Sequence, residues 1–109
     1  MVSVEEFNRI DIRVGRIIEV APFPEARKPA YKLWIDFGPL GIKQSSAQIT
    51  DLYQPEELVG KLVVAVVNFP AKIIAGFRSD VLVLGAYRED GAVVLLRPDT
   101  EVNPGAHIG

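Results

Sequence analysis

The order of the apolar segments limits the fold of this chain more than any other feature of its sequence. One short helix is defined by Pro55 at its first position, by Glu56 and Glu57 in its first turn and by Gly60 beyond its end. Three strand-like segments precede that helix and three follow it. These six segments cover residues 10–21, 31–37, 43–49, 61–68, 81–88 and 92–97.

This order is that of the OB-fold, a five-stranded Greek-key barrel that often carries a helix between its third and fourth strands. The chain of 109 residues is long enough for one domain with a modest core. We therefore predict an all-β protein with a single OB-fold domain over residues 1–109. The last strand and the tail after it form a C-terminal extension of the barrel.

Local signals refine this picture. An S-x-x-E pattern at Ser3 and Glu6 predicts one capped helical turn at the N-terminus. Gly15 inside the first strand predicts a bulge or a sharp bend. Asp90 and Gly91 predict a tight hairpin, and residues 69–80 read as a loop with a short extended piece. One face of the first strand is shared by Ile10, Ile12, Val14, Ile18 and Val20.

Three segments are apolar at consecutive positions, so both faces of these strands have to be buried. They cover residues 62–67, 81–87 and 92–96. A small barrel has only one interior, and no residues remain in the chain to cover the outside. A second copy of the chain is the economical cover, and the sequence therefore predicts a homodimer.

The sequence offers little for catalysis. It contains no cysteine and one histidine, His107, which excludes a Cys–His pair and a zinc site built from one chain. No phosphate-binding, dinucleotide-binding or hydrolase motif occurs. Ser45, Ser46 and Ser79 have no evident base other than Lys43 or Lys72. We predict a protein that is not an enzyme and that uses no metal and no cofactor.

The N-terminus lacks a secretory signal pattern, and the longest aliphatic segment is far too short to cross a membrane. The absence of cysteine fits a reducing compartment. These features predict a cytoplasmic location without membrane insertion. The net charge of −2 argues against a nucleic-acid partner, but residues 9–43 hold seven Lys and Arg against four Asp and Glu. Two interpretations of this local excess therefore stay open: a basic face that binds nucleic acid, and an ordinary solvated surface.

The segment KQSSAQI (43–49) places Gln44, Ser45 and Ser46 in the middle of a strand. In an OB-fold, the second and third strands form the ligand face. Alternation in the second strand points Lys32 and Trp34 away from the core. Small polar groups beside an aromatic ring suit an extended peptide, whose backbone needs partners and whose side chains need pockets.

Further candidates for this ligand face are Lys43, Phe69, Lys72, Phe77 and Arg78. Each candidate also has an ordinary structural explanation. Trp34 could pack in a dimer, Phe69 and Phe77 could plug the barrel mouth, and the cations could be solvated surface residues. The serines could belong to an edge strand that avoids aggregation. The residues alone leave these alternatives open.

Several segments together resemble the tRNA-binding domain, an OB-fold that occurs in tRNA-binding proteins and is appended to some aminoacyl-tRNA synthetases. The segments that carry the resemblance are DIRVGRI, YKLWIDFG, YQPEELVGKLVVAVVN, AGFRSDVLVLGA and VVLLRPDTEVNPGAHIG. Three segments are similar to the small homodimeric bacterial chaperones of this family that are associated with protein export. These are FPEARKPAYKL, GIKQSSAQIT and NFPAKIIAGFRSDVLVLG.

The resemblance implies a chaperone that binds unfolded or precursor polypeptides, with the export ATPase as a further candidate partner. It adds Asn68 and Ser79 to the ligand-binding candidates, since both match the family pattern. The chain departs from the tRNA-binding members at Ala47-Gln48, where they have Ser-Gly, and at Val81-Leu82, where they have Gly-Met. A structure-specific tRNA-binding protein is therefore the alternative function.

Overall fold

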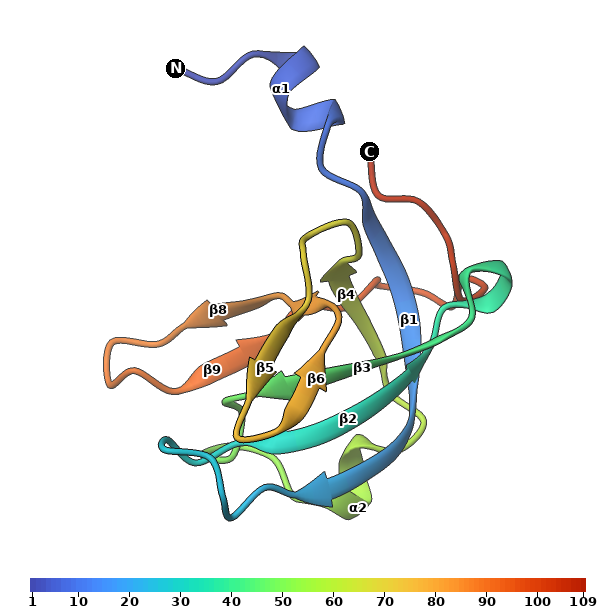
Figure 1. The fold of residues 1–109 in the computed structure, drawn as a ribbon. Helices are drawn as coiled ribbons and strands as arrows, with labels where there is room; N and C mark the ends of the chain where they lie inside the picture. Colours follow the sequence, from blue (N-terminus) through green and yellow to red (C-terminus); the bar gives the residue numbers. More distant parts are fainter.

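Five strands form one antiparallel sheet that curls into a nearly closed barrel (Figure 1). The computed structural model describes all 109 residues. The neighbours in the sheet follow the order β3-β2-β1-β4-β7, and every pair is antiparallel. These strands are β1 (Ile12–Pro22), β2 (Tyr31–Asp36), β3 (Ile42–Ala47), β4 (Leu62–Val66) and β7 (Leu82–Val83).

Two hairpins, two short α-helices and one 3-10 turn complete the fold. The hairpins pair β5 (Lys72–Ile74) with β6 (Phe77–Ser79), and β8 (Gly85–Tyr87) with β9 (Val93–Leu95). The helices are α1 (Val4–Asn8) and α2 (Pro55–Leu58), and the 3-10 turn is η1 (Gly38–Leu40). Helix α2 connects β3 to β4, which confirms the predicted all-β barrel of the OB type. Neither helix has the length and apolar character needed to cross a membrane.

Both helices begin as their sequences predict. The Ser3 hydroxyl accepts a hydrogen bond from the Glu6 N–H, and the Glu6 carboxylate accepts one from the Ser3 N–H. The Glu57 carboxylate accepts the Gln54 N–H in the same way at the start of α2. Helix α1 buries no side chain and extends away from the barrel (Figure 1).

Polar groups close the barrel between β3 and the segment that leads into β7. The Asp80 N–H donates to the Gln44 carbonyl at 2.8 Å, and the Ser46 N–H donates to the Ser79 hydroxyl at 3.0 Å. The Ser45 hydroxyl donates to the Val81 carbonyl at 2.9 Å. Side chains thus replace part of the backbone ladder at the closure, which explains a polar segment in an otherwise apolar barrel.

The main core fills the barrel interior and includes Ile17, Leu33, Ile35 and Phe37, all fully buried. Gly15 faces this core, where a Cβ atom would lie 2.5 Å from a methyl group of Ile35. Gly15 therefore permits close packing. The bulge in β1 lies further along, between Ile17 and Glu19. The bulge reverses the alternation, so Val20 packs against the main core whereas Ile12 lies on the opposite, outer side of β1. The single face predicted for Ile10, Ile12, Val14, Ile18 and Val20 is therefore not continuous, and Ile18 is exposed.

A second, smaller cluster lies on the outer side of β1 and β4. It contains Ile12, Val64 and Val66, and the partly buried Ile108 of the tail packs against it. The Ile108 N–H donates to the Ile12 carbonyl, and the Gly105 N–H donates to the Val14 carbonyl. The prediction that no residues remain to cover the strand at 62–67 was therefore wrong, because the C-terminal tail of the same chain covers it.

Two strand assignments also differ from the sequence interpretation. Residues 81–88 do not form one strand, because β7 pairs with β4 and β8 pairs with β9. Residues 69–80 contain a complete hairpin, β5–β6, where a loop with one short extended piece was expected. Its turn is only Ala75-Gly76, and its strands have three residues each. Strands this short show no readable alternation in the sequence, and they depend on contacts with the barrel for their stability.

Candidate functional site

Outward-facing side chains of β2 and β3, together with the hairpin β5–β6 that lies against them, form what we name the outer face. Trp34 stands opposite Gln44, and Lys32 stands opposite Ser46. The flanking positions Leu33 and Ser45 are fully buried. Alternation therefore places four of the predicted site residues, Lys32, Trp34, Gln44 and Ser46, on one surface, as cross-strand neighbours.

Ser45 lies on the other side of β3, inside the barrel. Its exposed fraction is 0%, and its hydroxyl donates a hydrogen bond to the Val81 carbonyl. A ligand on the outer face cannot reach it, so we remove Ser45 from the ligand-binding candidates. Lys43 pairs with Ile35 in the register of β3 and is half-buried. Its positive charge acts on Asp80, as described below.

Gln44 connects the second strand to the hairpin. The Trp34 indole N–H donates to the Gln44 side-chain oxygen at 3.2 Å. The Gln44 amide nitrogen donates in turn to the Arg78 carbonyl at 3.0 Å. Since both ends of the Gln44 amide are engaged within the chain, this side chain organises the outer face and holds β6 against it.

Aromatic rings cover part of the outer face. The Phe77 ring meets Trp34 edge-on at 5.8 Å between centroids, and meets Phe23 at 5.5 Å. The Lys32 ammonium lies 4.8 Å from the Phe23 centroid and 5.2 Å from the Phe77 centroid. Trp34 is therefore part of a packed aromatic cluster and not an open stacking platform. Phe23 was not among the predicted site residues, although its position between Pro22 and Pro24 distinguishes it.

Asp80 anchors the hairpin to β3. One carboxylate oxygen accepts Arg78 Nε at 2.6 Å, and the other accepts the Gln44 N–H at 3.2 Å. Burial alone would raise the pKa of Asp80. The hydrogen bonds from Arg78 and Gln44 and the charges of Arg78 and Lys43 outweigh burial and lower that pKa below its usual value. Asp80 therefore stays charged, and Arg78 is occupied by it.

A hollow of about 270 Å³ opens beside the outer face, under the hairpin β5–β6. Its lining includes Ser46, Phe69, Lys72, Ile74, Ser79 and Leu82. Phe69 and Leu82 expose 46% and 49% of their surface there. The fold therefore gathers the predicted residues Ser46, Phe69, Lys72 and Ser79 around one depression. No local pattern marked Ile74 and Leu82, because Ile74 lies in the segment predicted as a loop and Leu82 in an apolar strand segment.

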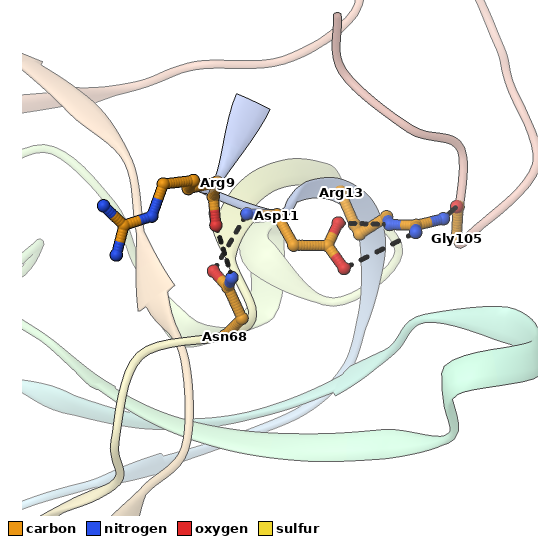
Figure 2. A network of polar contacts seen from close by, with 5 residues as sticks. All are labelled: Arg9, Asp11, Arg13, Asn68 and Gly105. Carbon is orange, nitrogen blue, oxygen red and sulfur yellow. Dashed lines mark hydrogen bonds and ion pairs between the residues drawn. The ribbon is translucent and has the colours of Figure 1, made fainter. Parts of the chain in front are cut away.

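Asn68 lies apart from this hollow and has a structural role (Figure 2). Its side-chain oxygen accepts the Asp11 N–H at 2.9 Å, and its side-chain nitrogen donates to the Arg9 carbonyl at 2.8 Å. Arg13 pairs with Asp11 at 2.6 Å and donates to the Gly105 carbonyl at 3.1 Å. This network ties α1 and the C-terminal tail to the barrel, which explains the DIRVG segment and Asn68 without a ligand.

The chain also lacks a grouping suited to a metal ion, since no three His, Asp or Glu side chains gather closely enough to hold one. The outer face offers hydroxyl groups, ammonium groups and apolar rings. Such a surface can bind a ligand by hydrogen bonds and apolar contact.

Comparison with known proteins adds independent findings. Residues 12–107 match the family model described as "Putative tRNA binding domain". The crystal structure of a CsaA chaperone protein from Picrophilus torridus is 56% identical, with a TM-score of 0.94 and full coverage of both chains. The crystal structure of chaperone CsaA from Bacillus anthracis strain Ames is 54% identical, with a TM-score of 0.95. The match covers all of this chain and 99% of that one.

A curated relative of a different kind is a methionine–tRNA ligase from Archaeoglobus fulgidus. It is 41% identical over 108 residues, which make up 98% of this chain but only 16% of the ligase. The chain thus spans about a sixth of the length of that curated relative. The shared part corresponds to one barrel and not to the rest of the ligase.

Proposed function

The chain belongs to the family of the tRNA-binding domain, and we propose that it acts as a chaperone that binds unfolded or precursor polypeptides on its outer face. The observation that carries this proposal is the hollow beside β3, where apolar side chains such as Phe69 and Leu82 stand next to hydroxyl groups. An extended polypeptide needs apolar pockets and hydrogen-bond partners together. The similarity to two CsaA chaperones supports the same function.

Binding of tRNA is the second candidate function, and the family match favours it. The charges of the outer face favour a polypeptide ligand over tRNA. Arg78 is paired with Asp80, whose carboxylate keeps its charge. RNA binders of this kind gain most of their affinity from cations that contact phosphates. The net charge of −2 supplies no general attraction for a polyanion.

One titration series distinguishes the two functions. The protein is titrated with a denatured polypeptide and with tRNA, each at about 50 and about 200 mM salt. We expect polypeptide binding that changes little between the two salt concentrations, because apolar contact supplies most of it. Tight tRNA binding that falls steeply with salt, together with no binding of the polypeptide, would establish the second function instead.

The remaining parts of the functional prediction are also proposals. We propose that the chain is not catalytic, forms a homodimer, acts in the cytoplasm and serves protein export, with the export ATPase as a partner. The exposed surface of β8 and β9 supports the dimer, since Tyr87 exposes 82% of its surface there. Sedimentation of the purified ATPase with and without this protein tests the partnership. If the two proteins bind each other, the mixture contains a complex that sediments faster than either protein alone.

A further inference from the structure

Four polar side chains form a row across four neighbouring strands. Lys32 of β2 stands opposite Ser46 of β3. The Ser46 N–H donates to the hydroxyl of Ser79 in β6 at 3.0 Å. Ser79 stands opposite Lys72 of β5. Cross-strand partners share a face, and the bond between Ser46 and Ser79 joins the two pairs, so the row runs ammonium, hydroxyl, hydroxyl, ammonium.

The row has unused capacity to donate hydrogen bonds. The three ion pairs of the chain are Arg13–Asp11, Arg16–Glu101 and Arg78–Asp80, so neither lysine has a carboxylate partner. The Ser46 hydroxyl makes no hydrogen bond within the chain. The Ser79 hydroxyl accepts one bond and keeps its own hydrogen to donate. A ligand that accepts hydrogen bonds and carries negative charge would complete this row.

The surroundings of the row are apolar. Ser46, Ser79 and Lys72 lie at the hollow of about 270 Å³, together with Phe69, Ile74 and Leu82. At the other end, the rings of Phe23 and Phe77 hold the Lys32 ammonium in place. Held ammonium groups lose less freedom on binding than free ones do, which favours a specific contact over general attraction.

We propose that this row is a carboxylate-binding site, and that the chain selects polypeptide segments in which a carboxylate stands next to large apolar residues. The carboxylate accepts hydrogen bonds from Ser46 and Ser79 between the two ammonium groups, and the apolar neighbours enter the hollow. This inference rests on the proposed polypeptide binding and adds which segments are chosen.

A carboxylate fits the site better than an RNA phosphate backbone. The row supplies two free cations, whereas a backbone presents one charge per nucleotide and is bound by many cations. The Asp80 carboxylate lies beside the row and is paired with Arg78, and its repulsion is smaller for one carboxylate than for the several phosphates of an extended polyanion. Apolar walls next to the donors suit leucine or phenylalanine side chains, which RNA lacks. A single carboxylate with apolar neighbours satisfies all three features.

The test uses two unstructured peptides with blocked ends that differ only in a central Glu or Gln between Leu and Phe. Fluorescence anisotropy measures their affinity for the wild-type protein and for Lys32→Met and Lys72→Met. Methionine keeps most of the apolar stem and removes the charge. Lys61→Met, on the α2 side of the barrel, is the matched control, since Lys61 lies outside the row.

We expect the Glu peptide to bind about tenfold more tightly than the Gln peptide, since hydrogen bonds to a charged group contribute strongly when partly desolvated. Each row variant should remove most of this preference, taken as the ratio of the two peptide affinities for the same variant, whereas Lys61→Met should preserve it. A third peptide with Gln and a free C-terminal carboxylate shows which source is used. If this third peptide binds as tightly as the Glu peptide, the site recognises the C-terminal carboxylate of a chain.

Equal affinity of the wild-type protein for the Glu and Gln peptides would overturn the carboxylate site and leave polypeptide binding intact. Loss of tRNA affinity in both row variants, with unchanged peptide affinities, would also overturn it, because the row would then contact phosphate. Absence of binding to every peptide and to denatured protein would refute the proposed function itself. The comparison of the Glu and Gln peptides on the wild-type protein needs no variant. It therefore tests the carboxylate site even if Lys32→Met folds poorly.

Discussion

Ala75 is the one residue other than glycine with a positive φ, 46°, and Gly76 follows it with a φ of 82°. The two residues form the turn between β5 and β6. Two successive positive φ angles are typical of a type I′ turn, in which Asn-Gly is the preferred pair. A side chain such as that of alanine costs about 1 kcal/mol or more in this region. The hairpin under which the hollow opens thus contains local backbone strain.

Replacing Ala75 with Asn should therefore raise the free energy of unfolding by about 1 kcal/mol, because Asn tolerates this conformation better. Denaturant unfolding measures the change. Ala86→Asn is the matched control, since Ala86 is exposed in β8 without a positive φ, and it should give no gain. A destabilised Ala75→Asn protein would show that this turn does not carry the strain that its φ angles indicate.

The adjacent residues Ser45 and Ser46 differ in what they contact. Ser45→Ala should lower the free energy of unfolding by about 1 to 3 kcal/mol, because the buried Val81 carbonyl loses its donor. Ser46→Ala should leave stability nearly unchanged, since the Ser46 hydroxyl has no partner in the chain. Thermal unfolding of both variants makes the comparison. Equal losses would contradict the assignment of Ser45 to the interior and Ser46 to the outer face.

At the scale of elements, the attachment of the hairpin β5–β6 to β3 depends on a charged Asp80. The pKa of Asp80 is lowered in the folded chain, so its contribution to stability is present above the unfolded pKa of about 3.9 and lost as pH falls through the folded value. Asp80→Asn should cost about 1 kcal/mol at pH 7.

The difference between wild type and Asp80→Asn should therefore shrink as pH falls below about 4. Thermal unfolding at several pH values between about 3 and 7 measures it. Asp99→Asn serves as a control, because the exposed Asp99 forms no ion pair. A difference between Asp80→Asn and wild type that stays constant down to pH 3 would mean that the carboxylate does not hold the hairpin.

The elements also show how far sequence reasoning reaches. Strands with clear alternation, such as β2, and the helix marked by Pro55 were predicted well, because burial of one face determines both. The hairpin β5–β6 was missed, since three-residue strands show no period. Val20 was assigned to the face of Ile12 because a bulge is set by pairing with β2 and not by local sequence. Ser45 and Ser46 could not be told apart until the register of β3 was known.

At the scale of the whole molecule, the tail covers the outer face of β4, which removes one argument for a dimer and leaves another. The tail does not cover Tyr87, which exposes 82% of its surface. A homodimer that buries β8 and β9 should sediment at about twice the chain mass of 12.0 kDa. Obligate interfaces typically bury about 2,000 Å² or more.

Sedimentation below micromolar concentration should thus show a dimer for the wild-type protein and a weakened one for Tyr87→Glu, which brings a charge into that interface. Ile73→Glu is the control, since Ile73 is 67% exposed and belongs to the hairpin β5–β6 and not to β8 or β9. A wild-type monomer would refute the dimer, and unchanged association of Tyr87→Glu would place the interface elsewhere.

The affinity of Ser46→Glu for a denatured polypeptide is the decisive measurement for polypeptide binding at the outer face. The new carboxylate would stand in the outer face beside the hollow, where desolvation and repulsion oppose a bound segment. We predict at least a tenfold loss of affinity, about 1.4 kcal/mol, with unchanged thermal stability and unchanged affinity of Ile73→Glu. Wild-type affinity in a stable Ser46→Glu protein would contradict polypeptide binding at this face.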